Sequence, residues 1–439
     1  MTVRVILTRS DGGEMVIPMA LSDGAPRNLP LINSVAAEVT DDELTALQAQ
    51  GFEVFPDERM FIPPYPPKVR AAFMFPTQES RPETPGPMEQ MSETGVEDLL
   101  RLGYSGAGVH IGIADTGVDA DHPDLIGRLE KWGDFVERGN EEPKDPNGHG
   151  TACCGISCGS GATVAKFHGV APKASFSMAR VLEEDGGGYT SAIIEGVTWL
   201  ADQGCKIINL SLGSTSVMYT PMSKAVDQLC ERGITVCVAA GNDGPLGRIT
   251  SPANAYKCIA AAACDQVGRR ADFSSVGPAT GKDEEDVAKP DIMAWGENVV
   301  MARSNHGKDE GIQVHDEYQA MDGTSFSSPF VAGCAALYMQ AVGDLDGFKE
   351  TIQQTAVDSP DLTYDQEGPG RIEIYEAIAK ELGVDSVPQC SDPDPDPPVT
   401  PPTPPVDPDG QFTPGCGTTL AAVALVLVAG FEIVRHFMG

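Results

Sequence analysis

The stretch Asp322–Gly333, DGTSFSSPFVAG, predicts the start of a core helix with a serine at its N-terminus. Pro329 and the small and apolar residues after it indicate a helix entering a core, because proline is tolerated in the first turn of a helix. Ser325 would then lie where free backbone N–H groups favour developing negative charge. That position suits a nucleophile whose reaction forms an oxyanion. A simple serine or threonine N-cap is the alternative, and the rest of the chain has to decide between them.

Upstream of this helix, strand-like and helical patterns alternate from about residue 89 to residue 382. The strand-like runs are rich in Val and Ile and end in polar residues or glycine: VHIGIAD, ASFSMARVL, CKIINLSL and ITVCVAAG. The helical segments between them are TSAIIEGVTWLADQG and SKAVDQLCERG. This alternation predicts an α/β fold with a mostly parallel central sheet and helices on both faces. Ligands of such sheets bind at the carboxyl ends of strands, where Asp115 and Asn242 are expected.

Four further segments flank this alternating region. Residues 1–65 predict a small α+β domain with a helix over TDDELTALQAQG, in which Thr40 is the N-cap and Gly51 the stop. Residues 66–88 predict a linker within a Pro-rich stretch that begins near Phe61, and residues 383–414 predict an acidic, Pro-rich stalk. Residues 415–434 predict a transmembrane helix, since the chain is uncharged from Gln411 to Phe431 and about 17–25 residues span a bilayer. A buried C-terminal helix is the alternative for this last segment.

The charge of the chain excludes one class of partner. Its 64 acidic and 30 basic residues give a formal net charge of -34, which repels nucleic acid and acidic membrane surfaces. We therefore expect no nucleic-acid partner, and attribute the excess to solubility, with a preference for basic substrates as the functional alternative. Eleven cysteines leave at least one without an intramolecular partner, and their apolar surroundings favour buried, reduced thiols. No cysteines show zinc-ligand spacing, so the sequence predicts no metal site.

Four motifs in order give the chain a specific resemblance. They are DTG around Asp115, HGT around His149, INLSLG from Ile208 to Gly213, and GTSxxSP around Ser325. Over residues 89–382 the chain resembles the subtilisin-like (subtilase) serine endopeptidases, which share this Asp–His–Ser order. The resemblance implies a three-layer subtilisin-like fold.

The resemblance also implies roles that the chemistry of the residues supports. A serine hydroxyl is a weak nucleophile and needs an adjacent base, so His149 would take the proton of Ser325 and return it to the leaving amine. Asp115 would orient His149 and stabilise its charged form. The oxyanion would be bound by the Asn242 amide and the backbone N–H of Ser325. The expected reaction is peptide-bond hydrolysis through an acyl-enzyme.

The residues that would bind substrate follow from the same resemblance. Two extended segments are expected to flank a bound peptide, and further residues to form the pocket for the side chain before the scissile bond. The flanking residues are Ser211, Leu212, Gly213, Gly187 and Gly188, and the pocket residues are Ala239, Ala240, Gly241 and, at its floor, Thr250. No cofactor is required. A structural calcium ion stays open, although the loop CGSGATVAKFHG, where the family would bind it, lacks a carboxylate.

Residues 1–65 resemble, more weakly, the inhibitory propeptide of subtilases, with an ordinary N-terminal domain as the alternative. The resemblance implies that the enzyme removes this segment by a cut between residues 62 and 88. Substrates would be proteins and peptides, and a monomer is expected. The protein is predicted to be anchored in a membrane by a single pass near its C-terminus, with the catalytic domain outside the cytoplasm or, alternatively, on the cytoplasmic side.

Two rival functions remain at this point. GISCG around Ser157 satisfies the nucleophile-elbow pattern of other hydrolases, which requires a strand before it and a helix after it. The second rival is a catalytically silent, membrane-tethered peptide-binding protein built on a subtilase scaffold.

Overall fold

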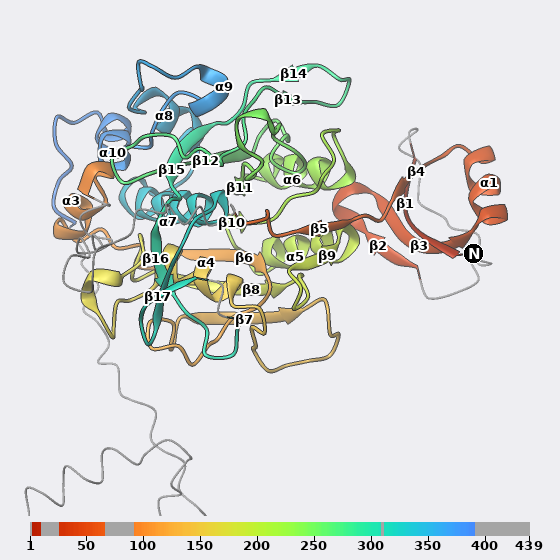
Figure 1. Ribbon diagram of the computed structural model, residues 1–439, viewed down its shortest axis with the longest axis horizontal. Helices are drawn as coiled ribbons and strands as arrows, with labels where there is room; N and C mark the ends of the chain where they lie inside the picture. Colours follow the sequence, from red (N-terminus) through yellow and green to blue (C-terminus); the bar gives the residue numbers. More distant parts are fainter. Residues whose placement is uncertain (1, 10–25, 66–91, 309–310, 391–439) are drawn as a thin grey trace, which may run out of the picture. The chain divides into compact units, whose positions relative to one another are not determined.

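The computed structural model describes residues 2–9, 26–65, 92–308 and 311–390, and its main feature is a seven-stranded parallel sheet (Figure 1). In chain order the strands are β6 His110–Asp115, β7 Leu129–Asp134, β8 Ser175–Arg180, β10 Ile207–Leu210, β11 Thr235–Ala239, β12 Ile259–Cys264 and β15 Ile292–Trp295. Their order across the sheet is β15-β12-β11-β10-β6-β8-β7, and every neighbouring pair is parallel. The strand order therefore reverses beside β6, which is where a parallel sheet forms a ligand-binding crevice.

Both faces of this sheet are buried because successive strand residues alternate between two apolar cores. In β10, for example, Ile207 belongs to one core and Ile208 to the other. The main helices of the first core are α4 His149–Cys158 and α7 Thr324–Val342, and those of the second are α5 Thr190–Asp202 and α6 Pro221–Glu231. The predicted α/β fold, with a mostly parallel central sheet and helices on both faces, is confirmed.

Smaller elements complete the body around the sheet. The short helices are η2 Ser92–Thr94, α3 Val96–Arg101, η3 Ala165–Phe167, η4 Gly244–Leu246, α8 Phe348–Gln354, α9 Tyr364–Glu367 and α10 Ile374–Leu382. The short strands are β9 Gly187–Tyr189, β13 Ala279–Thr280, β14 Asp286–Val287, β16 Val299–Ala302, β17 Ile312–His315 and β18 Tyr318–Met321. β16, β18 and β17 form an antiparallel sheet, and so do β13 and β14.

The N-terminal region forms its own antiparallel sheet with one helix. Its strands are β1 Thr2–Arg9, β2 Arg27–Leu29, β3 Ser34–Thr40 and β4 Phe52–Pro56, in the order β2-β3-β1-β4, with α1 Asp41–Ala49 as the helix. Thr40 caps α1 through a reciprocal pair of hydrogen bonds with Glu43, as the sequence predicts. Gly51 follows the helix with a φ of 85°, a left-handed conformation that favours glycine.

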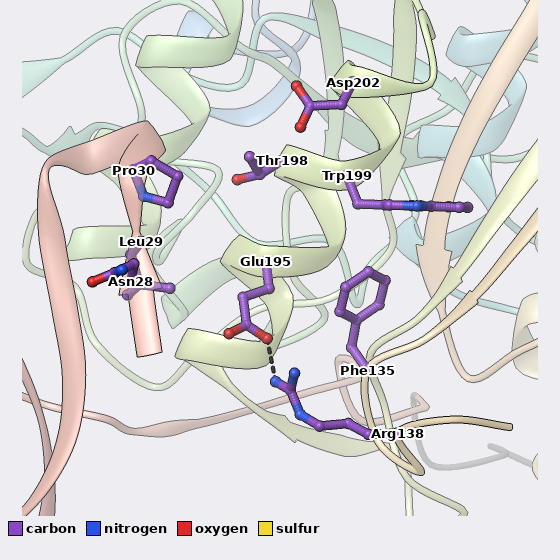
Figure 2. A pocket seen from close by; sticks show the side chains of 9 residues that line it. All are labelled: Asn28, Leu29, Pro30, Phe135, Arg138, Glu195, Thr198, Trp199 and Asp202. Atoms are coloured by element: carbon purple, nitrogen blue, oxygen red, sulfur yellow. Dashed lines mark hydrogen bonds and ion pairs between the residues drawn. The ribbon is translucent and has the colours of Figure 1, made fainter. Parts of the chain in front are cut away.

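This N-terminal sheet packs on α6 through the short helix η1 Pro30–Ile32 and on α5 through β2. Leu31 and Ile32 are buried in the second core, and Lys224 Nζ donates a hydrogen bond to the Ile32 carbonyl over 3.2 Å. A hollow beside this contact is shown in Figure 2; its lining residues are Asn28, Leu29, Pro30, Phe135, Arg138, Glu195, Thr198, Trp199 and Asp202. No predicted site residue lines the hollow, so the reaction has to be sought elsewhere.

The described part of the predicted stalk belongs to the packed body. Val387 is buried, and its backbone N–H donates to the Tyr375 hydroxyl over 3.0 Å. Further along, the Cys390 N–H donates to the Leu102 carbonyl over 2.9 Å. Val387 and Cys390 therefore attach this segment to the body, while most of the other residues of 383–390 are exposed. The predicted linker at 66–88 and the rest of the stalk, 391–414, lie outside the described residues.

The predicted membrane location is contradicted. In the ranges that the structure describes, no helix combines the length and the apolar character needed to cross a bilayer. The segment 415–434, on which that prediction rests, lies outside the described residues. The membrane location is therefore withdrawn.

Candidate active site

The predicted acid and base meet at the carboxyl end of the central strand. Asp115 is the last residue of β6 and His149 is the first residue of α4. His149 Nδ1 lies 2.8 Å from Asp115 Oδ1, and both side chains are fully buried. Burial is the largest single influence and disfavours the charged imidazole. The charge and hydrogen bond of Asp115, together with the neighbouring Cys153 and Tyr65, outweigh burial and hold the pKa of His149 well above its usual range.

A buried carboxylate that the sequence analysis does not identify orders the start of α4. Asp145 accepts hydrogen bonds from the backbone N–H groups of Gly148 and Thr151, each over 2.8 Å, and from the Thr151 hydroxyl. It also accepts one from the Thr116 hydroxyl, next to Asp115. A carboxylate at a helix N-terminus accepts hydrogen bonds from N–H groups that have no partner within the helix. Because Asp145 bonds both to the start of α4 and to Thr116 beside β6, it fixes the position of His149 relative to β6. The DPNGH pattern, with an aspartate just before the helix, is the signal that could have revealed it.

Ser325 lies at the start of the core helix, but the helix begins earlier than predicted. α7 starts at Thr324, so Ser325 is its second residue and Pro329 lies inside the helix rather than in its first turn. Because proline has no N–H, the carbonyl four residues before it, that of Ser325, loses its helical donor. The Ser211 hydroxyl replaces that donor over 2.7 Å. Pro329 is therefore tolerated because a side chain from the end of β10 satisfies the backbone beside the predicted nucleophile.

The Ser211 hydroxyl is itself held by a buried chain of hydrogen bonds. It accepts from Asn209 Nδ2 over 2.9 Å, and the Ser328 hydroxyl donates to Asn209 Oδ1 over 2.6 Å. All three side chains are fully buried. Ser211, predicted to flank substrate, thus directs its side chain to the backbone of Ser325, and the chain of bonds ties the first turn of α7 to β10.

Asn242 follows β11 and reaches both α7 and the N-terminal region. Its Oδ1 accepts hydrogen bonds from the backbone N–H and the hydroxyl of Thr324, each over 2.9 Å. These bonds orient the amide so that Nδ2 points away from α7, where it donates to the Pro64 carbonyl over 3.1 Å. A peptide carbonyl therefore lies at the amide that the sequence predicts to be an oxyanion donor.

The atoms that a proton transfer would use are buried and unpartnered. Among the described residues, Asp115 Oδ2, His149 Nε2 and Ser325 Oγ each have no hydrogen-bond partner. Such atoms are rare in folded proteins and call for an explanation. A site whose hydrogen bonds tighten only in the transition state supplies one.

A short strand from the N-terminal region lies across this site. β5 Arg59–Phe61 pairs antiparallel with β9, placing Phe61 opposite Gly187 and Met60 opposite Gly188. On its other edge, Phe61 exchanges both backbone hydrogen bonds with Gly213, at 2.8 and 2.9 Å. β5 thus has backbone partners on both edges, β9 on one and Gly213 on the other, and the chain that follows reaches Asn242 through the Pro64 carbonyl.

The predicted substrate residues divide into two groups. Gly187, Gly188 and Gly213 pair with β5, as described above. The others show no hydrogen bond to β5 in the described part of the chain, and their pocket role stays a prediction: Leu212, Ala239, Ala240, Gly241 and Thr250. Leu212, Ala239 and Ala240 are buried, and the Gly241 N–H donates to the Thr324 hydroxyl over 3.0 Å.

Cys153 is a further neighbour that the sequence analysis does not single out. Its sulfur lies 3.9 Å from His149 Nδ1, and burial raises the pKa of its thiol. In the described residues, Asp115, His149 and Cys153 form the one group of His, Cys, Asp and Glu side chains whose ligand atoms lie within 4.8 Å of each other. His149 Nδ1 already faces Asp115, so we assign no metal to this group.

The rival pattern around Ser157 lacks the geometry that it needs. Ser157 lies inside α4, is fully buried, and donates its hydroxyl to the Pro329 carbonyl over 3.1 Å. A nucleophile elbow requires an exposed turn from strand to helix. Ser157 therefore does not lie on such a turn, and its hydroxyl makes a structural hydrogen bond.

Comparison with known proteins agrees with this geometry. The sequence model that describes the subtilase family matches residues 106–373 of this chain. The chain is 38% identical over 287 residues to the serine protease AprX of Bacillus subtilis, covering 58% of this chain and 63% of that protein. It is 34% identical over 273 residues to thermitase of Thermoactinomyces vulgaris and 35% over 280 residues to subtilisin DY of Bacillus licheniformis, covering 89% and 92% of those proteins. The chain thus spans less than two thirds of the first relative and most of the other two.

Proposed function

The chain belongs to the subtilase family and carries a subtilisin-like serine endopeptidase domain; from this premise we propose that Ser325, His149 and Asp115 perform its peptide-bond hydrolysis. The observation that carries the proposal is the buried His149–Asp115 pair at 2.8 Å, with His149 Nε2 and Ser325 Oγ left unpartnered. The proposed substrates are extended segments of proteins and peptides, the proposed enzyme is a monomer, and the chemistry requires no cofactor.

The proposed reaction proceeds by acyl transfer. His149 Nε2 takes the proton of Ser325 as Ser325 Oγ attacks the carbonyl carbon of the substrate. The oxyanion that forms accepts hydrogen bonds from Asn242 Nδ2 and the Ser325 backbone N–H. His149 then gives its proton to the leaving amine, which breaks the peptide bond and leaves the acyl group on Ser325. Water repeats these steps to release the acid, while Asp115 stabilises the charged His149 throughout.

The N-terminal region is proposed to be an inhibitory propeptide that the enzyme removes. Two contacts besides β5 support this proposal. The Asp57 carboxylate accepts hydrogen bonds from the backbone and the hydroxyl of Ser191 at the start of α5, over 2.9 and 2.7 Å. Beyond β5, the Tyr65 ring stacks on Phe326 with centroids 6.5 Å apart. Since the Pro64 carbonyl lies at Asn242, the proposed cut is the Pro64–Tyr65 bond.

Replacing Asn242 with alanine tests the proposed oxyanion site. We expect kcat on a quenched peptide to fall by about 10²–10³-fold, the loss known for this donor in subtilisin, with KM nearly unchanged. KM should hold because strand pairing with Gly187 and Gly213 is untouched. Thr324→Val is the matched control: it removes the hydroxyl that donates to Asn242 Oδ1 and accepts from the Gly241 N–H, but it keeps the Nδ2 donor, so its loss should stay under about tenfold. Equal losses in the two variants would contradict the proposed role.

The raised pKa of His149 predicts an alkaline activity profile. Only neutral His149 can accept the proton of Ser325, and the pKa of His149 lies above the usual value of about 6.5. Activity should therefore rise about tenfold per pH unit below this pKa and level off above it. The measurement is kcat/KM between pH 5 and 10 at constant ionic strength. A profile that is already flat at pH 6 would exclude a base with a raised pKa.

A further inference from the structure

We propose that Glu183 and Asp185 form an acidic subsite that selects a basic side chain in the substrate, at the strand position that Arg59 occupies in β5. The inference rests on the proposed function, because it takes β5 as a stand-in for a bound substrate. The substrate residue concerned lies well upstream of the bond that is cut. The two acids that would contact it lie on the loop between β8 and β9.

The guanidinium of Arg59 shows how the subsite would hold a cation. Its Nη1 donates to Asp185 Oδ2 over 3.1 Å and its Nη2 to Asp185 Oδ1 over 2.8 Å, which makes a bidentate pair. Nη2 also donates to Glu183 Oε2 over 3.1 Å. Paired bonds of this geometry fix the direction of approach as well as adding strength, and they favour arginine over lysine.

The acidic loop has a defined conformation of its own. Asp185 Oδ1 accepts the Gly187 N–H over 2.9 Å, and the backbone of Glu183 exchanges hydrogen bonds with Gly186 and Gly187 over 2.9 and 2.8 Å. These bonds join residues 183–187 to one another and involve no residue of β5. The Asp185 carboxylate and the backbone of Glu183 are therefore ordered by the loop itself, and the negative charge of the two acids favours a cation that enters between them.

The pairing of β5 determines which substrate residue meets this loop. Arg59 lies opposite Tyr189, two residues before Phe61, which exchanges its backbone bonds with Gly213. A Cβ on Gly187 would lie 2.7 Å from both Arg59 Nη2 and Phe61 Cε1, so the glycine leaves room for these side chains. Any peptide that enters the same register presents the same position to Glu183 and Asp185. Their side chains are 44% and 57% exposed, so they are accessible to such a peptide.

The loop provides its own control residue. Glu184 lies between the two acids, but its carboxylate faces Lys308 Nζ at 3.6 Å and makes no contact with Arg59 among the described interactions. Glu184→Gln thus makes the same charge change on the same loop without altering the subsite.

The test compares quenched peptides that differ only by Arg or Gln at each upstream position, cleaved by mature wild type, E183Q, D185N, the double variant and E184Q. We expect wild type and E184Q to favour Arg about fivefold in kcat/KM at one position, the range of a partly exposed ion pair. The preference should fall in E183Q and D185N, vanish in the double variant, and weaken in 1 M salt, which screens exposed charges.

The possible results separate this inference from the function on which it rests. Equal cleavage of all peptides by wild type overturns the subsite and leaves the endopeptidase intact. A preference for Arg that survives in the double variant also overturns it, since other groups would then be responsible. D185N could alter the loop, because it weakens the bond that Asp185 accepts from Gly187. In that case the result for E183Q decides whether the subsite exists, because the Glu183 carboxylate contacts Arg59 alone among the interactions described. Failure to cleave any peptide overturns the proposed function together with the subsite.

Discussion

Protein carrying Ser325→Ala is expected to keep its N-terminal domain and to turn over peptide substrates about 10⁶-fold more slowly, the loss known for nucleophile removal in subtilisin. Without the hydroxyl oxygen no acyl-enzyme forms, and only transition-state binding by the oxyanion donors remains. The change should not harm folding. Ser325 is fully buried, but its Oγ has no hydrogen-bond partner in the part of the chain that the structure describes, so truncation leaves none of these residues unsatisfied.

The measurement is the intact mass of purified wild type beside the variant. Wild type should lose an N-terminal piece ending at Pro64, within the predicted range of residues 62–88, and the variant should stay whole. Ser327→Ala is the matched control on the same helix. Its hydroxyl donates to the Ala294 carbonyl over 3.1 Å, so losing it should lower the free energy of unfolding by about 1 kcal/mol while processing continues.

Other outcomes of this experiment have distinct meanings. If Ser325→Ala is processed like wild type, the nucleophile is another residue. If both proteins stay whole, a fluorophosphonate probe distinguishes the remaining cases. Labelling of Ser325 in wild type would mean an active enzyme whose N-terminal domain is not a propeptide. No labelling and no hydrolysis would leave a catalytically silent peptide-binding protein.

Replacing Asp115 with asparagine is expected to lower kcat about 10⁴-fold at neutral pH, the size known for this change in a trypsin-type triad. The amide keeps the shape of the carboxylate but not its charge, so it cannot hold His149 in the tautomer that leaves Nε2 free to accept a proton. Burial then acts on His149 without the opposing charge, and the pKa of His149 should fall.

This second effect gives a readout that a merely damaged fold would not produce. The pH at which His149 titrates, followed by NMR of its ring, should move to lower values in Asp115→Asn. Asp119→Asn is the control: Asp119 is also buried, but its carboxylate accepts from the Asn305 and Asp121 backbones. It should lose stability and keep the wild-type titration of His149. A shift of equal size in both variants would argue against a direct pairing with Asp115.

Local sequence patterns determined most of the fold and the chemical centre. The strand that ends at Asp115 is a continuous apolar run buried on both faces, and the Thr40 cap and Gly51 stop define a helix within a dozen residues. The apolar run and the helix boundaries both depend on residues that are close to each other along the chain, so they can be recognised in the sequence alone. The same holds for the motifs around His149 and Ser325, whose spacing within each motif is short.

Tertiary structure alone decided how these pieces are held and what occupies the site. β5 has three residues and precedes prolines, so it lacks any periodic signal; it becomes a strand because β9 and Gly213, more than a hundred residues away, offer free edges. Pro329 lies inside α7 because the Ser211 hydroxyl satisfies the carbonyl that it orphans. Glu183 and Asp185 meet Arg59 only because the fold brings residues more than 120 positions apart together. In each case the partner is distant in sequence, and the contact exists only once the chain has folded.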